Sequence, residues 1–176
     1  MLATAAVLAI ELRGNPFFVQ ERVGRHGHRF RMLKLRTMRH PRPGEEEHYV
    51  VEDFSKFVFA PTEAPHPRVT RIGAIARKTS LDELPNLFNV LAGDMSLVGP
   101  RPEIPEIVAQ FPEAYHRRHE VSPGVAGLAQ ANGRSDLTYD AIATYDLEYV
   151  DHHSVLTDIR ILAKTALAVV RGIGAR

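Results

Sequence analysis

Residues 80–102, SLDELPNLFNVLAGDMSLVGPRP, constrain the fold of this chain more than any other segment. Two adjacent carboxylates stand near the start, a Gly-Asp pair follows, and a Pro-Arg-Pro element ends the segment. Apolar residues recur between these features at helical spacing, namely Leu84, Leu87, Phe88 and Leu91. Because glycine adopts the left-handed conformation that ends many helices, Gly93 marks a stop. The pattern predicts a helix that begins near Arg77, carries this apolar face and ends at Gly93.

The adjacent carboxylates, Asp82 and Glu83, allow two interpretations. Neighbours in a regular helix point about 100° apart and rarely share one target. At a helix start, however, free N–H groups and the helix dipole favour anions, and Pro85 suits a first turn. The alternative is structural, because Ser80 and Glu83 match a capping box and Asp82 could simply complement the dipole. Taken alone, the residues favour the capping interpretation.

The composition fits one folded domain and excludes several classes of protein. Of the 176 residues, 44% are hydrophobic and 24% charged, which is ordinary for a globular protein with a core. The 22 Lys and Arg against 21 Asp and Glu give a net charge of +1, so we expect no nucleic-acid partner. The lack of cysteine excludes disulfides and thiolate metal sites. No Walker A, dinucleotide-binding or serine-hydrolase motif is present.

Other segments predict the rest of the fold. FFVQER and RFRMLKLR flank VGRHGH, in which Gly24 and Gly27 can take the positive φ of a hairpin turn. Residues 39–65 are rich in Pro, Glu and His and are interpreted as an inserted surface loop. Helices are expected over 139–150 and 155–171, with a shorter one over 103–115 interrupted by two prolines. We therefore predict a helix-dominated α+β single domain with a small β-hairpin near its N-terminus.

Two segments could contact a membrane. Residues 1–10, MLATAAVLAI, are apolar, but crossing a bilayer takes about 20 residues of helix, so they cannot cross it alone. Residues 155–171 form a basic amphipathic pattern, with Ile159, Leu162, Ala166, Val169 and Val170 on one face and Arg160, Lys164 and Arg171 on its flank. Such a pattern suits a membrane surface. Periodicity alone favours a surface helix packed on the core.

Three ordered blocks of the sequence closely resemble the bacterial sugar transferase family, the monotopic phosphoglycosyl transferases. They are residues 20–38, QERVGRHGHRFRMLKLRTM, residues 80–102, and residues 122–134, SPGVAGLAQANGR. The resemblance extends over most of the chain but not over 39–65. Family members begin with a longer hydrophobic helix that enters the membrane and turns back. The resemblance therefore implies that residues 1–13 are a remnant of that helix, and it favours amphipathic interfacial helices.

The resemblance implies an activity on a lipid carrier. It identifies Asp82 as a nucleophile and Glu83 as its partner, a ligand of Mg²⁺, which prefers oxygen ligands and shields phosphate charge. A sugar-1-phosphate would pass from a UDP-sugar to Asp82 and then to polyprenyl (undecaprenyl) phosphate. The product would prime glycan or exopolysaccharide assembly at the cytoplasmic face of the bacterial inner membrane. The sequence does not indicate which sugar is used or the oligomeric state.

Transfer of a phosphoryl group also needs cations and donors around the phosphates. Arg101 is a strong candidate, because its flanking prolines stiffen the backbone and a guanidinium matches two phosphate oxygens. The further candidates for substrate binding are Lys34, Arg77, Gln130, Asn132, Arg134 and Asp146. For Arg36, on the same strand face as Lys34, a solvated charge is an equally good interpretation.

Two alternatives to a transferase stay open at this point. The chain could be a noncatalytic assembly partner at the membrane surface with the same fold. It could also be a soluble binder or hydrolase of nucleotide sugars, a reading favoured only by the short apolar N-terminus. Release of nucleoside monophosphate, dependent on Mg²⁺ and on Asp82, would separate the transferase from the noncatalytic partner.

Overall fold

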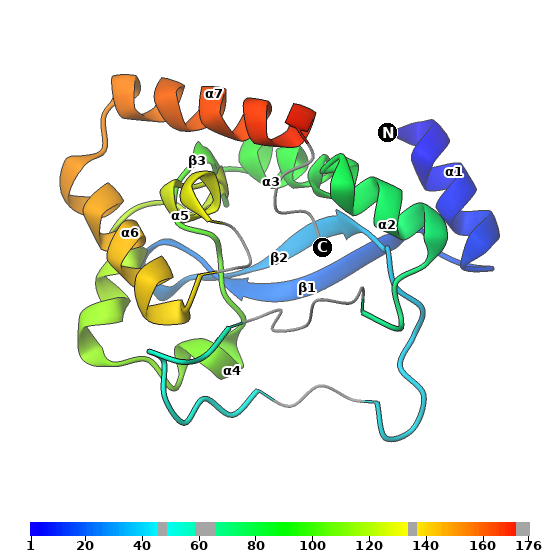
Figure 1. Ribbon diagram of the computed structural model, residues 1–176, viewed down its shortest axis with the longest axis horizontal. Coiled ribbons are helices and arrows are strands. Elements are labelled where there is room, and N and C mark those ends of the chain that lie inside the picture. The colour runs from blue at the N-terminus through cyan, green and yellow to red at the C-terminus, as the bar shows by residue number, and fades with distance from the viewer. Residues whose placement is uncertain (46–48, 59–65, 134–136, 172–176) are drawn as a thin grey trace.

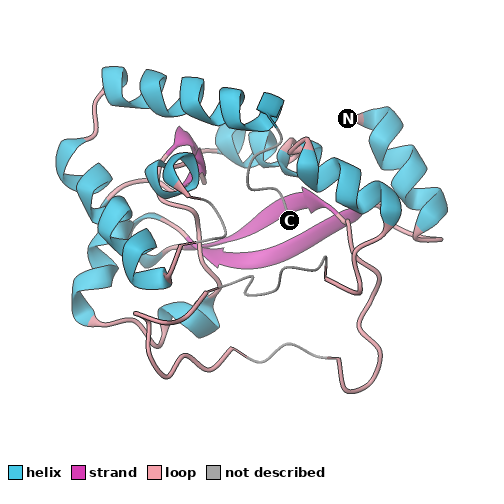
Figure 2. Ribbon diagram, viewed as in Figure 1, coloured by secondary structure: helices cyan, strands magenta, loops and turns pink. Residues whose placement is uncertain are grey.

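A β-hairpin lies at the centre of the molecule, and helices cover it along one side (Figure 1). The computed structural model describes residues 1–45, 49–58, 66–133 and 137–171. Strand β1 (Phe17–Val23) pairs antiparallel with β2 (Arg29–Leu35), with Phe17 opposite Leu35 and Val23 opposite Arg29. Figure 2 shows that helices dominate the remainder. The predicted helix-dominated α+β fold with an N-terminal hairpin is confirmed.

The hairpin turn differs in one detail from the prediction. Gly27 takes the expected positive φ of 77°, but Gly24 has a φ of −107°, and His26 takes the second left-handed position with a φ of 55°. Gly24 serves a different purpose. A Cβ at this position would lie 3.2 Å from the ring of Phe30, so the glycine lets that ring fold under the turn.

Helices α1 (Leu2–Glu11) and α2 (Arg71–Lys78) pack beside the open end of the hairpin. Ala5 and Leu8 of α1 form a small core with Leu35 of β2. The carboxylate of Glu11 accepts a hydrogen bond from the backbone N–H of Ile72, in the first turn of α2. A carboxylate is favourable at that end of a helix dipole. Among the described residues, no helix is both long and apolar enough to cross a membrane.

The single helix predicted from Arg77 to Gly93 is wrong, because the chain breaks it into three pieces. Helix α2 ends at Lys78, Ser80 takes a left-handed φ of 56°, and a 3₁₀ turn, η2 (Leu81–Glu83), follows. Helix α3 (Asn86–Ala92) then runs to Gly93, whose φ of 88° makes the expected helix end. A left-handed residue cannot continue an α-helix, so Ser80 redirects the chain just before the two carboxylates.

Helix α3 presents its apolar face outward. Its buried side chains are Asn86 and Asn89, whereas Phe88 is 55% and Leu91 84% exposed. The carboxamide of Asn89 accepts from the N–H of Leu33 and donates to the carbonyl of Arg31, so a polar side chain joins α3 to β2. The predicted apolar spacing is present, but it does not mark the side that packs on the core.

A second, parallel strand pair crosses beneath α7. Strand β3 (Ser96–Val98) pairs with β4 (Gly124–Ala126), and α5 (Leu128–Asn132), α6 (Tyr139–His152) and α7 (Val155–Arg171) follow. The two chain segments approach so closely that a Cβ on Gly124 would lie 2.1 Å from the amide nitrogen of Gly99, directly after β3. A glycine is therefore needed at position 124. Helices α6 and α7 occupy the predicted positions, and α6 runs two residues past its predicted end at 150.

The segment predicted as one helix over 103–115 is instead two short pieces packed into the core. Helix α4 (Pro105–Val108) starts at its proline, and Pro112 precedes the 3₁₀ helix η3 (Glu113–Glu120). Ile107 and Phe111 are buried with Tyr139 in an aromatic cluster. Part of the segment 39–65 reaches this cluster, because Phe54 and Phe57 pack on it and their carbonyls accept bonds from the first N–H groups of α6.

Candidate active site

Asp82 and Glu83 lie on the turn η2, between α2 and α3 and against β2. The capping box considered for Ser80 and Glu83 does not form, because Ser80 is left-handed and its side chain makes no capping hydrogen bond. The carboxylate of Glu83 instead turns to the hairpin. This geometry frees both acids from the structural role that the residues alone favoured.

Glu83 binds two cations from distant parts of the chain. Its Oε1 lies 2.9 Å from Lys34 Nζ on β2 and 2.9 Å from Arg101 Nη2 in the Pro-Arg-Pro element after β3. Burial opposes ionisation of Glu83, but the charges of Arg101 and Lys34 outweigh it and hold the pKa of the carboxyl well below its usual value. Glu83 is therefore a fixed anion that draws two predicted phosphate-binding residues together.

Of the two cations that bind Glu83, Lys34 loses its proton more easily. Burial, followed by repulsion from Arg101, lowers the pKa of the Lys34 ammonium to about 8, although the charge of Glu83 acts in the opposite direction. Burial disfavours a charged lysine because it loses hydration. Arg101 behaves differently: the charge of Glu83 outweighs burial and raises the pKa of its guanidinium.

Asp82 differs from its neighbour in having an unengaged carboxylate. Within the described part of the chain it takes part in no hydrogen bond or ion pair, and it is half-buried. Burial and then the charge of Glu83 raise the pKa of Asp82, against the charges of Lys34, Arg77 and Arg101. A partly desolvated carboxylate with cations nearby and no bound partner is available to react or to bind a ligand.

Arg77 approaches the site from the last turn of α2. A Cβ at Gly73 would lie 2.2 Å from the carbonyl oxygen of Thr37, so the helix can rest directly on the chain beyond β2. One turn later, Arg77 Nε donates to Thr37 Oγ1 at 2.9 Å. Arg36, by contrast, bonds His40 and is not among the charges that act most on Asp82.

The remaining predicted residues are dispersed. Both polar atoms of the Gln130 carboxamide are buried without a partner among the described residues, close to Gly127. Asn132 is exposed, donates to the carbonyl of Leu128, and accepts from Lys164 of α7. Arg134 lies outside the described residues. Asp146 of α6 is 1% exposed and pairs with Arg118 of η3 at 2.6 Å, and it is not among the charges that act most on Asp82.

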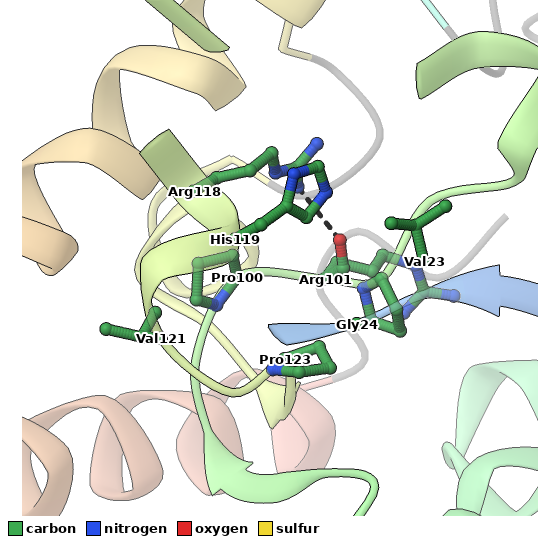
Figure 3. Close-up of a pocket in the computed structure, with 9 residues that line it drawn as sticks. Val23, Gly24, Pro100, Arg101, Arg118, His119, Val121 and Pro123 are labelled. Atoms are coloured by element: carbon green, nitrogen blue, oxygen red, sulfur yellow. Dashed lines mark hydrogen bonds between the residues drawn. The ribbon is translucent and has the colours of Figure 1, made fainter. Parts of the chain in front are cut away.

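Sequence reasoning missed two arginines near Arg101. Arg22 of β1 donates to the carbonyl oxygen of Pro102, and Arg118 donates to the carbonyl oxygen of Arg101. Figure 3 shows the bond from Arg118 to this carbonyl. Both look like ordinary surface charges in sequence, and only the fold reveals that Arg118 is buried and Arg22 half-buried.

Comparison with known proteins adds to this geometry. The profile of the bacterial sugar transferase family matches residues 1–172. The chain belongs to this family. The sequence resemblance is thereby confirmed, and so is the classification of the chain as a sugar-phosphate transferase enzyme.

Relatives of the transferase come from several bacteria. An uncharacterized sugar transferase, EpsL, of Bacillus subtilis is 40% identical over 170 residues, which cover 97% of this chain and 77% of that protein. The undecaprenyl-phosphate galactose phosphotransferase of Salmonella typhimurium is 39% identical over 169 residues, or 92% of this chain and 35% of the enzyme. A UDP-N-acetylgalactosamine-undecaprenyl-phosphate N-acetylgalactosaminephosphotransferase of Aeromonas hydrophila is 39% identical, with 40% of its length covered. The transferase chain thus spans less than half of these two enzymes.

The paired acids of the transferase fit a magnesium ion. Mg²⁺ takes oxygen ligands, commonly one or two carboxylates together with substrate phosphates. Both cations on Glu83 bind Oε1, which leaves Oε2 and the Asp82 carboxylate unengaged within the described part of the chain. No cluster of three or more potential ligands occurs among the described residues. The arrangement therefore suits a metal shared with a substrate better than a closed protein cage.

Proposed function

We propose that the transferase moves a sugar-1-phosphate from a UDP-sugar to undecaprenyl phosphate through an aspartyl phosphosugar on Asp82. The observation that carries the proposal is the contrast between the neighbouring acids. Glu83 is held between Lys34 and Arg101, whereas Asp82 has an unengaged carboxylate within the influence of the same cations. One acid is therefore suited to organise positive charge and the other to attack.

The reaction proceeds in two displacements at one phosphorus. A carboxylate oxygen of Asp82 attacks the phosphorus that bears the sugar, and the bond from this phosphorus to the bridging oxygen breaks and releases UMP. An oxygen of the acceptor phosphate then attacks the same phosphorus and frees the Asp82 carboxylate, which gives a polyprenyl diphosphate sugar. Phosphate groups supply both the leaving group and the second nucleophile, so neither step requires an added oxidant or reductant.

The surrounding residues stabilise charge and position. Lys34 of β2 and Arg101 of the Pro-Arg-Pro element bind Glu83 beside Asp82, and Arg77 adds a third positive charge from α2. Cations that are already in place when charge moves onto the leaving phosphate lower the barrier without reorganisation. Mg²⁺ bound by Glu83, together with Asp82 and the diphosphate, would supply further shielding of phosphate charge.

The acceptor is a lipid, and an apolar surface of the protein is suited to reach it. Exposed apolar side chains lie on four helices that run along one edge of the molecule in Figure 1: Leu2 and Ile10 on α1, Ile75 on α2, Phe88 and Leu91 on α3, and Val155, Leu156 and Ile159 on α7. Val169, Val170 and Arg171, part of the predicted amphipathic pattern, have side chains outside the described set. We place this edge against the cytoplasmic face of the bacterial inner membrane.

The covalent step gives the decisive test. The protein, in detergent or nanodiscs, is incubated with Mg²⁺ and each of several UDP-sugars without acceptor, and its intact mass is measured. One phosphosugar adduct is expected on the parent chain and none on Asp82→Asn. Addition of undecaprenyl phosphate should discharge the adduct. A folded parent chain that forms no adduct and releases no UMP with any donor would contradict the proposal, and UMP release without acceptor or adduct would indicate a hydrolase.

A further inference from the structure

The Pro-Arg-Pro element is held through its backbone by three separate parts of the fold. The carbonyl of Pro100 accepts from the N–H of Gly124 at 2.9 Å, that of Arg101 from Arg118 Nη2 at 2.8 Å, and that of Pro102 from Arg22 Nη1 at 3.1 Å. Prolines have no N–H to donate, so carbonyls are the groups by which such an element can be fixed. Three consecutive carbonyls are used in this way.

Arg118 cannot move away from its carbonyl without breaking other contacts. It is 3% exposed, pairs with Asp146 Oδ2 at 2.6 Å, and donates to the hydroxyl of Tyr139. Its guanidinium also lies over the rings of Phe111 and Tyr139, at 5.6 and 5.7 Å from their centroids. A guanidinium offers several donors in one plane, which lets one side chain bind three partners at once.

Arg22 is fixed in a similar way on the other side. Its Nη2 donates to Gln20 Oε1 at 2.7 Å, and its Nη1 lies 3.5 Å from Glu103 Oε2. The carbonyl of Glu103 also accepts from the N–H of Val23, so the chain beyond the Pro-Arg-Pro element is tied to the end of β1. Two arginines on separate elements therefore hold two neighbouring peptide units.

Stability alone does not account for these buried charges. A well-packed apolar pair of similar volume commonly replaces a buried ion pair without loss of stability. An apolar pair could not donate to the carbonyl of Arg101, however. The pair of Arg118 and Asp146 instead fixes the backbone of Arg101, from which the Arg101 side chain reaches Glu83.

We propose that Arg118 and Arg22 are positioning residues that hold Arg101 against Glu83, and that Asp146 acts by orienting Arg118. This inference rests on the proposed function for its effect on rate, because Arg101 matters there as a cation at the reacting phosphates. It gives Asp146, predicted from the sequence as a substrate-binding residue, a role in which Arg118 and Arg101 stand between it and the substrate. Small errors in the placement of a group at a reacting phosphate cost much rate.

The test replaces the buried pair as a unit. In Arg118→Met with Asp146→Leu, no charge is left unpaired, so the fold should survive and can be checked by circular dichroism and thermal unfolding. The matched control is Arg117→Met with Asp151→Leu. This pair joins the same elements, η3 and α6, but it is exposed, and within the described residues it makes no hydrogen bond or ion pair with Arg101. Adduct formation on Asp82 should slow about 10-fold or more in the buried-pair variant and less than about 2-fold in the control.

A double-mutant cycle separates positioning from general damage. If the buried pair acts through Arg101, its replacement should change the rate little in an Arg101→Ala background. Equal fold-losses in both backgrounds would overturn the proposal. The conservative variant provides a further check: Arg118→Lys keeps the charge beside Asp146 but lacks the planar guanidinium that spans Asp146, Tyr139 and the carbonyl of Arg101, so the melting temperature should stay closer to that of the parent than the rate does.

A second readout decides the inference even if the enzyme forms no adduct. NMR of the arginine side chains measures rotation about the Nε–Cζ bond, which should be slow for Arg101 in the parent and faster in the buried-pair variant. An Arg101 that stays equally restricted in both would overturn the positioning role. A parent that shows restricted Arg101 but no adduct would count against the proposed function and leave positioning supported.

Discussion

Two clusters in this protein each pair acidic with basic side chains, but they differ in whether a carboxylate is left without a partner. Glu83 meets Lys34 and Arg101 at a half-buried turn, and the neighbouring Asp82 is unengaged among the described residues. Arg118 and Asp146 are almost completely buried, and the arginine is engaged with several partners. The open cluster can bind and react, whereas the closed one can only hold structure in place. The role of an acid near an active site thus depends on whether its carboxylate is already paired with protein cations or is still able to bind a ligand.

The strongest test of the open cluster is Asp82→Asn. We expect the rate of UMP release to fall by at least about 10⁴-fold, because an amide is a poor nucleophile toward phosphorus. The melting temperature should stay the same or rise, since burial of the Asp82 charge is unfavourable. Glu106→Gln, an exposed acid of α4, is the control for loss of one negative charge. A large loss of stability with Asp82→Asn would show that Asp82, like Asp146, has a structural role.

The closed cluster should respond in the opposite way. Asp146→Ala leaves the buried Arg118 without its counter-charge and should lower the free energy of unfolding by about 3–5 kcal/mol. Denaturant unfolding measures this value. Asp151→Ala, which removes an exposed partner of Arg117, should cost about 1 kcal/mol or less. Similar losses of unfolding free energy for both variants would show that the buried pair of Asp146 and Arg118 contributes no more to stability than an exposed one.

A pH series sharpens the comparison through Lys34, whose charged neighbours are Glu83, Arg101 and Arg22. With the pKa of Lys34 lowered to about 8, the rate should fall above that pH, to about one tenth of its plateau by pH 9. Lys34→Arg should keep the rate level over this range, because arginine stays charged. An unchanged decline in Lys34→Arg would assign it to another group.

Stability should change with pH in the other direction over the same range. The folded pKa of Lys34 lies below its usual value of 10.5, so between pH 8 and 10.5 the unfolded chain binds a proton that the folded chain does not. Stability therefore rises with pH in this window as far as Lys34 contributes. The difference between the parent and Lys34→Met in denaturant unfolding isolates this contribution.

The smallest expected effect concerns the apolar edge beyond the open cluster. Leu91 is 84% exposed, and Leu91→Gln should weaken binding to anionic vesicles by roughly fivefold, or about 1 kcal/mol, with little change in unfolding. Flotation of the protein with vesicles gives the bound fraction. Val50→Gln, an exposed apolar residue outside these four helices, is the matched control. Equal losses for both would argue against a dedicated membrane edge.

The sequence predicted those helices and strands that are determined by residues close together in the chain. Two segments that flank a glycine-containing turn predicted the hairpin, and helical spacing predicted α7. The break at Ser80 was missed, because an apolar period continues through it and serine is not a residue type that signals a left-handed conformation. The same period located the apolar face of α3 but could not say that it points outward.

For the site, sequence blocks pointed to Asp82, Glu83, Lys34 and Arg101, and the fold brings these four together. Arg22 and Arg118 gave no signal, because a buried arginine and a solvated one look alike in sequence. Their role depends on carbonyls far along the chain, of Pro102 for Arg22 and of Arg101 for Arg118. Such pairings arise only from the fold.

The carboxamide of Asn89 covers part of the outer edge of β2. In the described residues, β2 pairs with only one other strand, so its outer edge could recruit a strand from another molecule. Asn89 occupies that edge by accepting from Leu33 and donating to Arg31, as a neighbouring strand would. The Asn89 side chain therefore leaves two fewer backbone groups of this edge for another strand to pair with.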